Sequence, residues 1–282
     1  MSEKKQGILY ILCAGFFFAL MTFFVRLSGD LPTMQKAFFR NGIAAIVISF
    51  VLIRSEEKFH ILKTSYRDIF FRCLFGTTGL ICNFYAIDKL AIADANILNK
   101  LSPFVALIMS YFILKEKANK IEIGSVVVAF IGAVFIIKPS FNLHSYYAFI
   151  GMLGGIGAGL AYTFVRKLGK NGERGPIIIF CFSLCSSVVC LPYLIFNYQP
   201  MTLQQTLILI LAGLCATGGQ FCITAAYKKA PAKEISIYDY SQVLFAAALG
   251  FIFLGQLPDV YSVIGYVLII GSAIFRWFYR SE

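Results

Sequence analysis

The chain is a succession of long apolar stretches separated by short polar ones. A helix that crosses the hydrocarbon core of a bilayer needs about 20 consecutive apolar residues, and stretches of this length recur along the whole sequence. The stretches lack the period-two alternation of membrane β-barrel strands. The pattern therefore predicts an all-α integral membrane protein with ten transmembrane helices, at residues 7–27, 34–54, 67–87, 91–114, 120–138, 146–166, 175–197, 204–227, 232–254 and 258–278.

The composition supports this interpretation and excludes several soluble classes. Of 282 residues, 59% are hydrophobic and only 14% are charged, whereas soluble chains carry roughly 25% charged residues. The polar segment 55–66 is too short to form a separate soluble domain. The eight cysteines all lie inside expected spans without a CxxC motif. We therefore expect them to act as packing residues, with no disulfide, metal or cofactor.

The positive charge of the chain indicates an orientation. The net charge is +11, and most Lys and Arg residues lie in short clusters between apolar stretches, as the positive-inside rule requires of cytoplasmic loops. This distribution predicts a multi-pass protein of the plasma or inner membrane with both termini cytoplasmic, and no nucleic-acid partner. The cations assigned to the cytoplasmic side are Lys4, Lys5, Arg54, Lys58, Lys63, Arg67, Arg72, Lys115, Lys117, Lys120, Arg166, Lys167, Lys170, Arg174, Lys228, Lys229, Lys233, Arg276 and Arg280.

The sequence matches itself when it is shifted by 140 positions. Residues 24–26 (Phe-Val-Arg) fall on 164–166, and the matches continue over further helix pairs without a gap. The chain is therefore predicted to consist of two five-helix halves, residues 1–140 and 141–282. Because each half has an odd number of helices, the second enters the membrane from the opposite side. Such inverted repeats are typical of secondary transporters, although a duplication that only adds stability is an alternative.

Several segments resemble one family of transporters. They are FFRNGIAAIVISFVL (38–52), SPFVALIMSYFILKEK (102–117), GLAYTFVRKL (159–168) and SQVLFAAALGFIFLGQ (241–256). Together they are similar to the EamA-type branch of the drug/metabolite transporter superfamily. The resemblance implies two EamA-like repeats that form one ten-helix transport domain and export or exchange small metabolites. Val243 and Gln256 depart from the residues usual in the family, Pro and Glu respectively.

Lys100 is an ionisable residue that the orientation signal does not explain. It lies about nine residues into the span 91–114, roughly 14 Å from the helix end at 1.5 Å per residue, which is close to the membrane midplane. Charged groups at this depth are costly and often belong to a substrate or ion path. Asn96, Asn99 and Ser102 lie beside Lys100. Pro103 is expected to kink the helix, to leave a carbonyl free for water or ligand, and to act in gating.

The repeat supplies an opposing surface for Lys100. The 140-residue shift places Asp239, Tyr240 and Gln242 opposite Asn99, Lys100 and Ser102, and Tyr238 and Glu234 precede them on the same expected helix. If the spans 91–114 and 232–254 face each other, Lys100 and Asp239 are partners. Two interpretations remain open: a fixed ion pair that joins the halves, or a site in which Lys100 binds an anionic substrate group and Asp239 or Glu234 carries a coupling proton.

Other polar residues inside spans are further candidates. Arg40 lies about six residues into its span, so that snorkelling to the interface and substrate gating are both open. Small residues at 76–79 and 217–220 predict close helix approaches. Asn83 and Gln220, next to these clusters, are expected to line a cavity with the substrate-binding group.

These patterns favour a secondary active transporter over an enzyme. We expect an exporter or exchanger of a small polar metabolite, such as an amino acid, working by alternating access around a central cavity. The expected partners are the substrate, the lipid bilayer and a coupling proton, in a monomer or homodimer. A lipid flippase or a cationic drug exporter of the same fold is the alternative.

Overall fold

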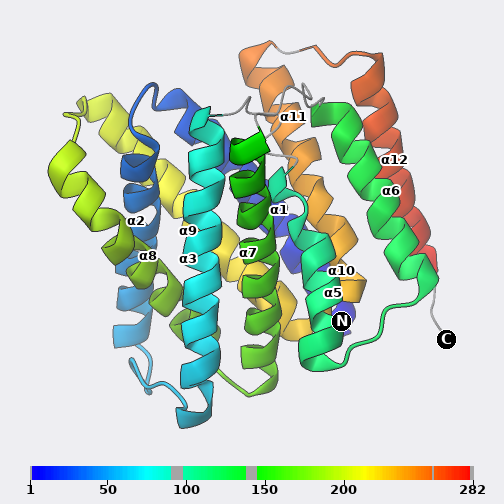
Figure 1. Cartoon of the computed structure of the whole chain (residues 1–282), viewed down its shortest axis with the longest axis horizontal. Coiled ribbons are helices and arrows are strands. Elements are labelled where there is room, and N and C mark those ends of the chain that lie inside the picture. The colour runs from blue at the N-terminus through cyan, green and yellow to red at the C-terminus, as the bar shows by residue number, and fades with distance from the viewer. Residues whose placement is uncertain (1, 90–97, 138–144, 256, 280–282) are drawn as a thin grey trace.

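Helices make up all the regular secondary structure in residues 2–89, 98–137, 145–255 and 257–279, the parts of the chain that the structure, a computed structural model, describes. Eight helical segments are long and apolar enough to cross a membrane, and α5 and α12 are two shorter apolar helices. The all-α membrane fold expected from the sequence is thus confirmed. The elements (Figure 1) are α1 Glu3–Leu27, α2 Thr33–Ile53, the 3-10 helix η1 Lys63–Ser65, α3 Tyr66–Lys89, α5 Ser102–Leu114, α6 Lys120–Ile137, α7 Ser145–Lys170, α8 Gly175–Asn197, α9 Leu203–Lys229, α10 Ala232–Ile235, the 3-10 helix η2 Ser236–Tyr240, α11 Ser241–Leu254 and α12 Val260–Phe278.

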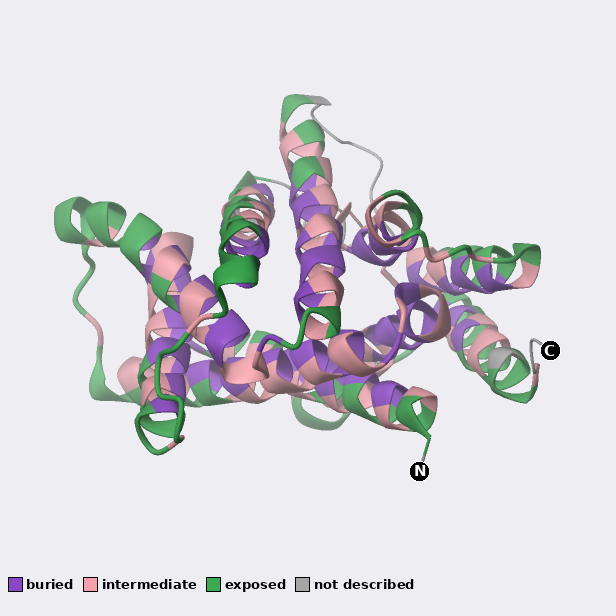
Figure 2. Ribbon diagram, turned by 90° about the horizontal axis from the view of Figure 1, so that it is seen from below, coloured by how far each residue is buried: buried purple, intermediate pink, exposed green. Residues whose placement is uncertain are grey.

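The outer flanks of the bundle are apolar. Large side chains such as Ile195 and Phe196 on α8, Ile252 on α11 and Val267 on α12 are exposed, and buried residues gather on the helix faces that meet one another (Figure 2). In water such a surface would drive association. In a bilayer it is solvated by lipid, so these flanks are the lipid-facing surface of a multi-pass membrane protein.

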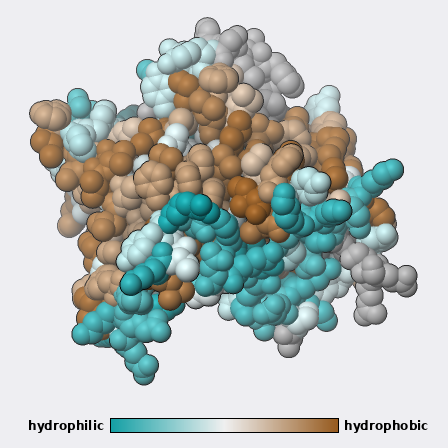
Figure 3. Space-filling model, turned by 60° about the horizontal axis from the view of Figure 1, so that its bottom comes forward, coloured by the Kyte–Doolittle hydropathy of each residue, from teal (hydrophilic) through white to brown (hydrophobic). Residues whose placement is uncertain are grey.

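Polar residues concentrate at one end of the bundle, here named the terminal face. It is the end at which α1 begins, α12 ends, and the connections 54–62, 115–119 and 171–174 turn (Figure 1). Figure 3 shows hydrophilic residues gathered at this end below a hydrophobic flank. All three connections carry cations that the sequence analysis assigns to the cytoplasmic side.

The main contacts between helices stay the same when each helix is replaced by its equivalent in the other sequence half. Helix α3 packs on α7 and α1 packs on α9, while α5 contacts α7 and α11 contacts α1. The pairs α2–α8 and α6–α12 form the two sides of the bundle (Figure 1). If α1, α3 and α5 are replaced by their sequence equivalents α7, α9 and α11, each contact maps onto another contact. An inverted repeat predicts this set of neighbours.

The span expected at 91–114 is interrupted. Residues 90–97, including Asn96, lie outside the described residues, and α5 begins at Ser102 after a short turn. Pro103 lies in the first turn of α5, where a missing N–H costs no hydrogen bond. The predicted kink within a continuous helix is therefore wrong: Pro103 starts a helix.

The span expected at 232–254 is interrupted in the same region of the fold. It consists of α10, η2 and α11, and α11 begins at Ser241. The two helices also end alike, because Lys115 after α5 and Gly255 after α11 both adopt left-handed backbone conformations, with φ of 58° and 64°. The spacing of hydrophobic residues does not reveal these breaks, since a 3-10 turn and an α-helix can carry the same apolar side chains.

Two glycines allow the closest approach between α3 and α7. A Cβ atom added at Gly157 would lie 2.8 Å from the Cα atom of Gly79, a distance that requires the backbones to separate. Gly79 lies in the small-residue cluster 76–79 that predicted close helix packing. Small residues at such crossings let the two helix backbones approach closely. The resulting van der Waals contacts hold the helices together, because lipid provides no hydrophobic driving force between them.

The Gly157→Ala substitution should therefore destabilise the protein by about 1–3 kcal/mol, the usual cost of overpacking. Gly124→Ala is the matched control, because no atom lies within 4 Å of a Cβ atom added there. Thermal unfolding in detergent measures both. Equal Tm values for the two variants would contradict the close crossing.

Candidate functional site

Lys100 lies at the break before α5 and contacts the break before α11. Its side chain is buried, with 7% exposure. The Nζ atom donates hydrogen bonds to Oε1 of Gln242 at 2.7 Å and to the backbone oxygen of Asp239 at 3.4 Å, and it lies 3.7 Å from Oδ2 of Asp239. Lys100 thus contacts Asp239, its predicted partner, and also Gln242, which was not predicted to bind it; the roles of these residues stay predictions.

Tyr240 closes the same junction from the other side. Its hydroxyl donates a hydrogen bond to the backbone oxygen of Lys100 at 3.1 Å, and the residue is fully buried. The interruption of the helix does leave the carbonyl of Lys100 to another partner, but that partner belongs to the protein and is not the water or ligand expected after a kink at Pro103. That partner is the tyrosine at the equivalent position of the second half.

The remaining predicted site residues divide between this junction and other places. Asn99 is half-buried and Ser102 is buried, and both flank Lys100 along the chain. The hydroxyl of Tyr238 instead contacts the backbone oxygen of Ala273 on α12 at 3.4 Å. Glu234 is half-buried on α10. Asn83 lies on α3, where its buried Oδ1 atom has no hydrogen-bond partner.

Arg40 points into the protein from α2. Its exposure is 8%, the Nε atom donates to the sulfur of Met21 at 3.1 Å, and Nη1 donates to Oδ1 of Asn41 at 3.0 Å. No carboxylate among the described residues lies within 4.0 Å of Arg40. The snorkelling interpretation is therefore wrong, because the guanidinium is enclosed by protein.

Arg72 is a site candidate that the sequence analysis missed. It was counted among the cytoplasmic loop cations, but the structure buries it in α3 with 2% exposure. Its guanidinium lies 4.0 Å from the ring centroid of Phe182, and Nη2 donates to Oε1 of Gln220 at 3.5 Å. The Nε atom has no partner. The position of Arg72 could have indicated burial, because it lies inside the predicted span 67–87 and a small residue, Gly76, follows one turn later.

Tyr162 of α7 is a half-buried polar side chain that interacts with several of these groups. Its ring stacks on Tyr227 with centroids 5.0 Å apart, and it lies within electrostatic range of Asp239, Arg72 and Arg40. Polar side chains from α2, α3, α7, α9 and the break before α11 thus converge on the centre of the bundle. They offer guanidinium, amide and phenol donors for a polar ligand.

Ion pairs join the two sequence halves at the terminal face. Glu116 after α5 contacts Arg166 at 3.2 Å and Lys170 at 2.6 Å, both on α7. Asp68 of α3 contacts Lys167 of α7 at 2.8 Å. Glu116 thus neutralises cations of α7. At this end the halves are held together by charge.

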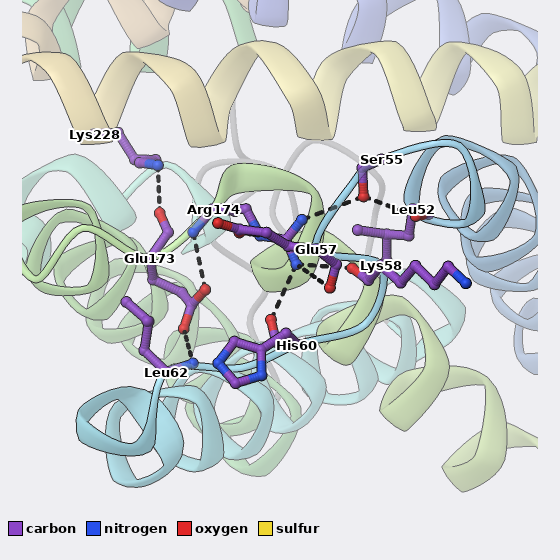
Figure 4. Close-up of polar contacts among 9 residues, drawn as sticks. All are labelled: Leu52, Ser55, Glu57, Lys58, His60, Leu62, Glu173, Arg174 and Lys228. Carbon is purple, nitrogen blue, oxygen red and sulfur yellow. Dashed lines mark hydrogen bonds and ion pairs between the residues drawn. The ribbon is translucent and has the colours of Figure 1, made fainter.

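Arg174 makes a further connection in the same region (Figure 4). Its Nε atom lies 2.9 Å from Oε2 of Glu57, and Nη2 donates to the backbone oxygens of Lys58 at 2.7 Å and His60 at 3.0 Å. The neighbouring Glu173 accepts at Oε2 from the backbone N–H of Leu62 at 3.1 Å. The α7–α8 connection therefore fixes the α2–α3 connection from the other half.

A cavity opens at the opposite end of the bundle. Its volume is about 570 Å³, and it is lined by the α1–α2 connection, the end of α3 and the end of α8, including Asp30, Tyr85, Lys89 and Gln199. Neither Lys100 nor Arg40 lines this cavity.

Comparisons with known proteins agree on one family. The model of the EamA-like transporter family matches residues 5–138 and again residues 145–277. The chain is 29% identical over 273 residues to the pseudopaline exporter CntI of Pseudomonas aeruginosa, covering 96% of this chain and 95% of the relative. It is 26% identical over 297 residues to solute carrier family 35 member G1 of Homo sapiens, covering 98% and 81%. A solved crystal structure with 14% identity has a TM-score of 0.80 and covers 95% of both chains, which shows a shared fold.

The contacts of Lys100 yield a stability prediction. Asp239→Asn leaves a buried ammonium without its carboxylate, which should lower the free energy of unfolding by about 3 kcal/mol. The double variant Lys100→Met, Asp239→Asn should recover most of this loss, because neither charge remains. Glu56→Gln, on the exposed α2–α3 connection, serves as the control. Thermal unfolding that shows additive losses in the double variant would refute energetic coupling of the pair.

Proposed function

The chain belongs to the EamA-like transporter family, and from this membership we propose that it exports a small polar metabolite by alternating access. The observation that carries the proposal is the junction at which Lys100 of one half meets Asp239 and Gln242 of the other. Export is the activity named for the Pseudomonas aeruginosa relative. We extend it to this chain at the level of a small metabolite.

Lys100 and Asp239 can couple substrate binding to proton binding. Their 3.7 Å separation is longer than a direct hydrogen bond, while the shorter contact of Lys100 is to neutral Gln242. A substrate anion competes with Asp239 for the ammonium. Protonation of Asp239 removes that competitor, so that the protonation state of Asp239 sets the affinity of Lys100 for the substrate anion. Glu234 on α10 is a second candidate proton carrier.

The ion pairs of the terminal face can act as a gate. They join residues of different halves, so they must break before the centre can open at that end. We assign the terminal face to the cytoplasm because it carries the clustered cations. In this arrangement the cytoplasmic gate is closed, while the cavity at the opposite end faces the outside of the plasma or inner membrane.

Transport by purified protein tests the proposal. Wild-type protein in proteoliposomes should move at least one small polar metabolite, and an imposed pH gradient should change the rate. Lys100→Ala should reduce transport by about tenfold or more, the effect of losing a charge-assisted contact. Lys63→Ala, at an exposed position in η1, is the matched control. Wild-type rate and affinity in Lys100→Ala would remove Lys100 from the substrate path, and pH-independent exchange would exclude proton coupling.

The gate predicts a local change in dynamics. Glu116→Gln removes the carboxylate shared by Arg166 and Lys170, so residues 115–119 and the end of α7 should exchange amide hydrogens faster. Hydrogen–deuterium exchange in nanodiscs measures this, with Glu56→Gln as the control. Unchanged exchange at both segments would show that these ion pairs do not hold the terminal face closed.

A further inference from the structure

The buried centre of the protein carries more positive than negative charge. Among the described residues, Arg40, Arg72 and Lys100 are buried away from the terminal face, and Asp239 is the buried carboxylate among them. Asp239 lies against Lys100. The other buried carboxylates, Asp68, Glu122 and Glu173, lie at the ends of helices or in a connection on the terminal face. Two guanidinium groups are left without a contacting carboxylate.

Asp68 does not neutralise Arg72, although it lies one turn away on α3. Its Oδ1 atom accepts from Nζ of Lys167 at 2.8 Å, and Oδ2 accepts from the amide of Asn171 at 3.3 Å. No ion pair within 4.0 Å joins Asp68 to Arg72 in the described parts of the chain. An unpaired charge in a membrane interior is expensive, and such groups usually face a substrate or ion path.

The surroundings of Arg72 hold it in one position. A Cβ atom at Gly76 would collide with Nη1 of Arg72 and would lie 2.9 Å from the ring of Phe182. The absence of a side chain at Gly76 thus lets the guanidinium lie along α3 against the Phe182 ring. Of the five N–H donors of a guanidinium, one donates to Gln220 and the buried Nε has no partner. The group is fixed, desolvated and has unused donors.

Arg40, on α2, also has N–H donors that are not used in hydrogen bonds among the described residues. It uses Nε and Nη1 on Met21 and Asn41, and the buried Nδ2 atom of Asn41 has no partner. Helices α2 and α3, which carry Arg40 and Arg72, contact each other, and the two guanidinium groups interact electrostatically with each other and with Tyr162. Two like charges are therefore held near one another in a low-dielectric interior, which favours a bound anion.

We infer that Arg40 and Arg72 bind two negatively charged groups of one ligand, so that the metabolite proposed above is an organic anion with at least two carboxylate or phosphate groups. The planar guanidinium pairs with both group types through two parallel hydrogen bonds. A zwitterionic amino acid would leave one arginine unpaired, and a cationic drug would be repelled by both. This inference rests on the proposed function for transport, but the binding site itself is tested separately.

Ligand binding to the full-length protein in nanodiscs is the direct test. The probes are succinate, citrate and glycerol 3-phosphate as soluble dianions or higher anions, phosphatidic acid in the nanodisc as a lipid source of the same chemistry, L-alanine as a zwitterion, and tetraphenylphosphonium as a cation. At least one soluble polyanion should raise the Tm at constant ionic strength. Stabilisation by alanine or tetraphenylphosphonium alone, by phosphatidic acid alone, or by no probe would overturn the inference.

Variants of Arg72 separate a binding role from a structural one. Arg72→Gln should weaken binding of the stabilising anion by about tenfold or more, and it should leave unchanged or raise the Tm of the ligand-free protein, because a buried uncompensated charge is removed. A merely structural Arg72 would give a lower ligand-free Tm. Gly76→Ala should weaken binding by displacing the guanidinium, and Arg67→Gln, at an exposed position of α3, should bind as the wild type does. Unchanged affinity in both Arg72→Gln and Arg40→Gln would overturn the site.

Transport assays distinguish failure of this inference from failure of the proposed function. If the protein transports alanine in proteoliposomes but neither binds nor transports any polyanion, the proposed transport function stands and the two-arginine site is rejected. If polyanions bind with the predicted dependence on Arg72 but are not transported, the two-arginine site stands and the proposed transport function is rejected.

Discussion

The requirement that every backbone polar group find a partner inside the protein governs this structure. Lipid offers no hydrogen bonds, so a helix can be interrupted at membrane depth only where another part of the protein satisfies the freed groups. Here two interruptions, before α5 and before α11, face each other, and the hydroxyl of Tyr240 binds the carbonyl of Lys100. The side chain of Lys100 in turn donates hydrogen bonds to Asp239 and Gln242 at the second break. The junction of polar side chains is thus also what allows both helices to be broken.

The sequence predicts the fold well because the membrane imposes a length on each apolar stretch. The meeting of Lys100 and Asp239 could also be predicted, since the 140-residue self-match specifies which residues of the two halves are equivalent. The helix breaks could not be predicted, because the polar residues at them, such as Lys100 and Asp239, are equally compatible with a continuous helix that lines a polar site. The structure departs from the prediction at Pro103 because proline is compatible both with a kink inside a helix and with the first turn of a helix, and the sequence pattern does not distinguish the two.

Arg72 shows the limit of reading charge from position alone. A cation less than two turns from a helix end is usually a loop or interface residue, and the positive-inside rule counts it as such. What distinguishes Arg72 is the direction of its side chain, which depends on Phe182 of α8 and Gln220 of α9. These contacts join residues far apart in sequence. Arg40 is the converse case, since its depth was evident but its burial depends on Met21 and Asn41.

The close crossing of α3 and α7 determines which parts of the molecule can move as rigid bodies. Gly79 and Gly157 bring the two backbones into close contact, with no room for a side chain between them. Yet α3 lies in the first sequence half and α7 in the second, and the same is true of the packed pair α1 and α9. If the proposed alternating access moves α3 as a rigid body, α7 is therefore expected to move with it. The two sequence halves are interleaved in the packed structure, so that a motion of the proposed transporter would have to carry helices of both halves together.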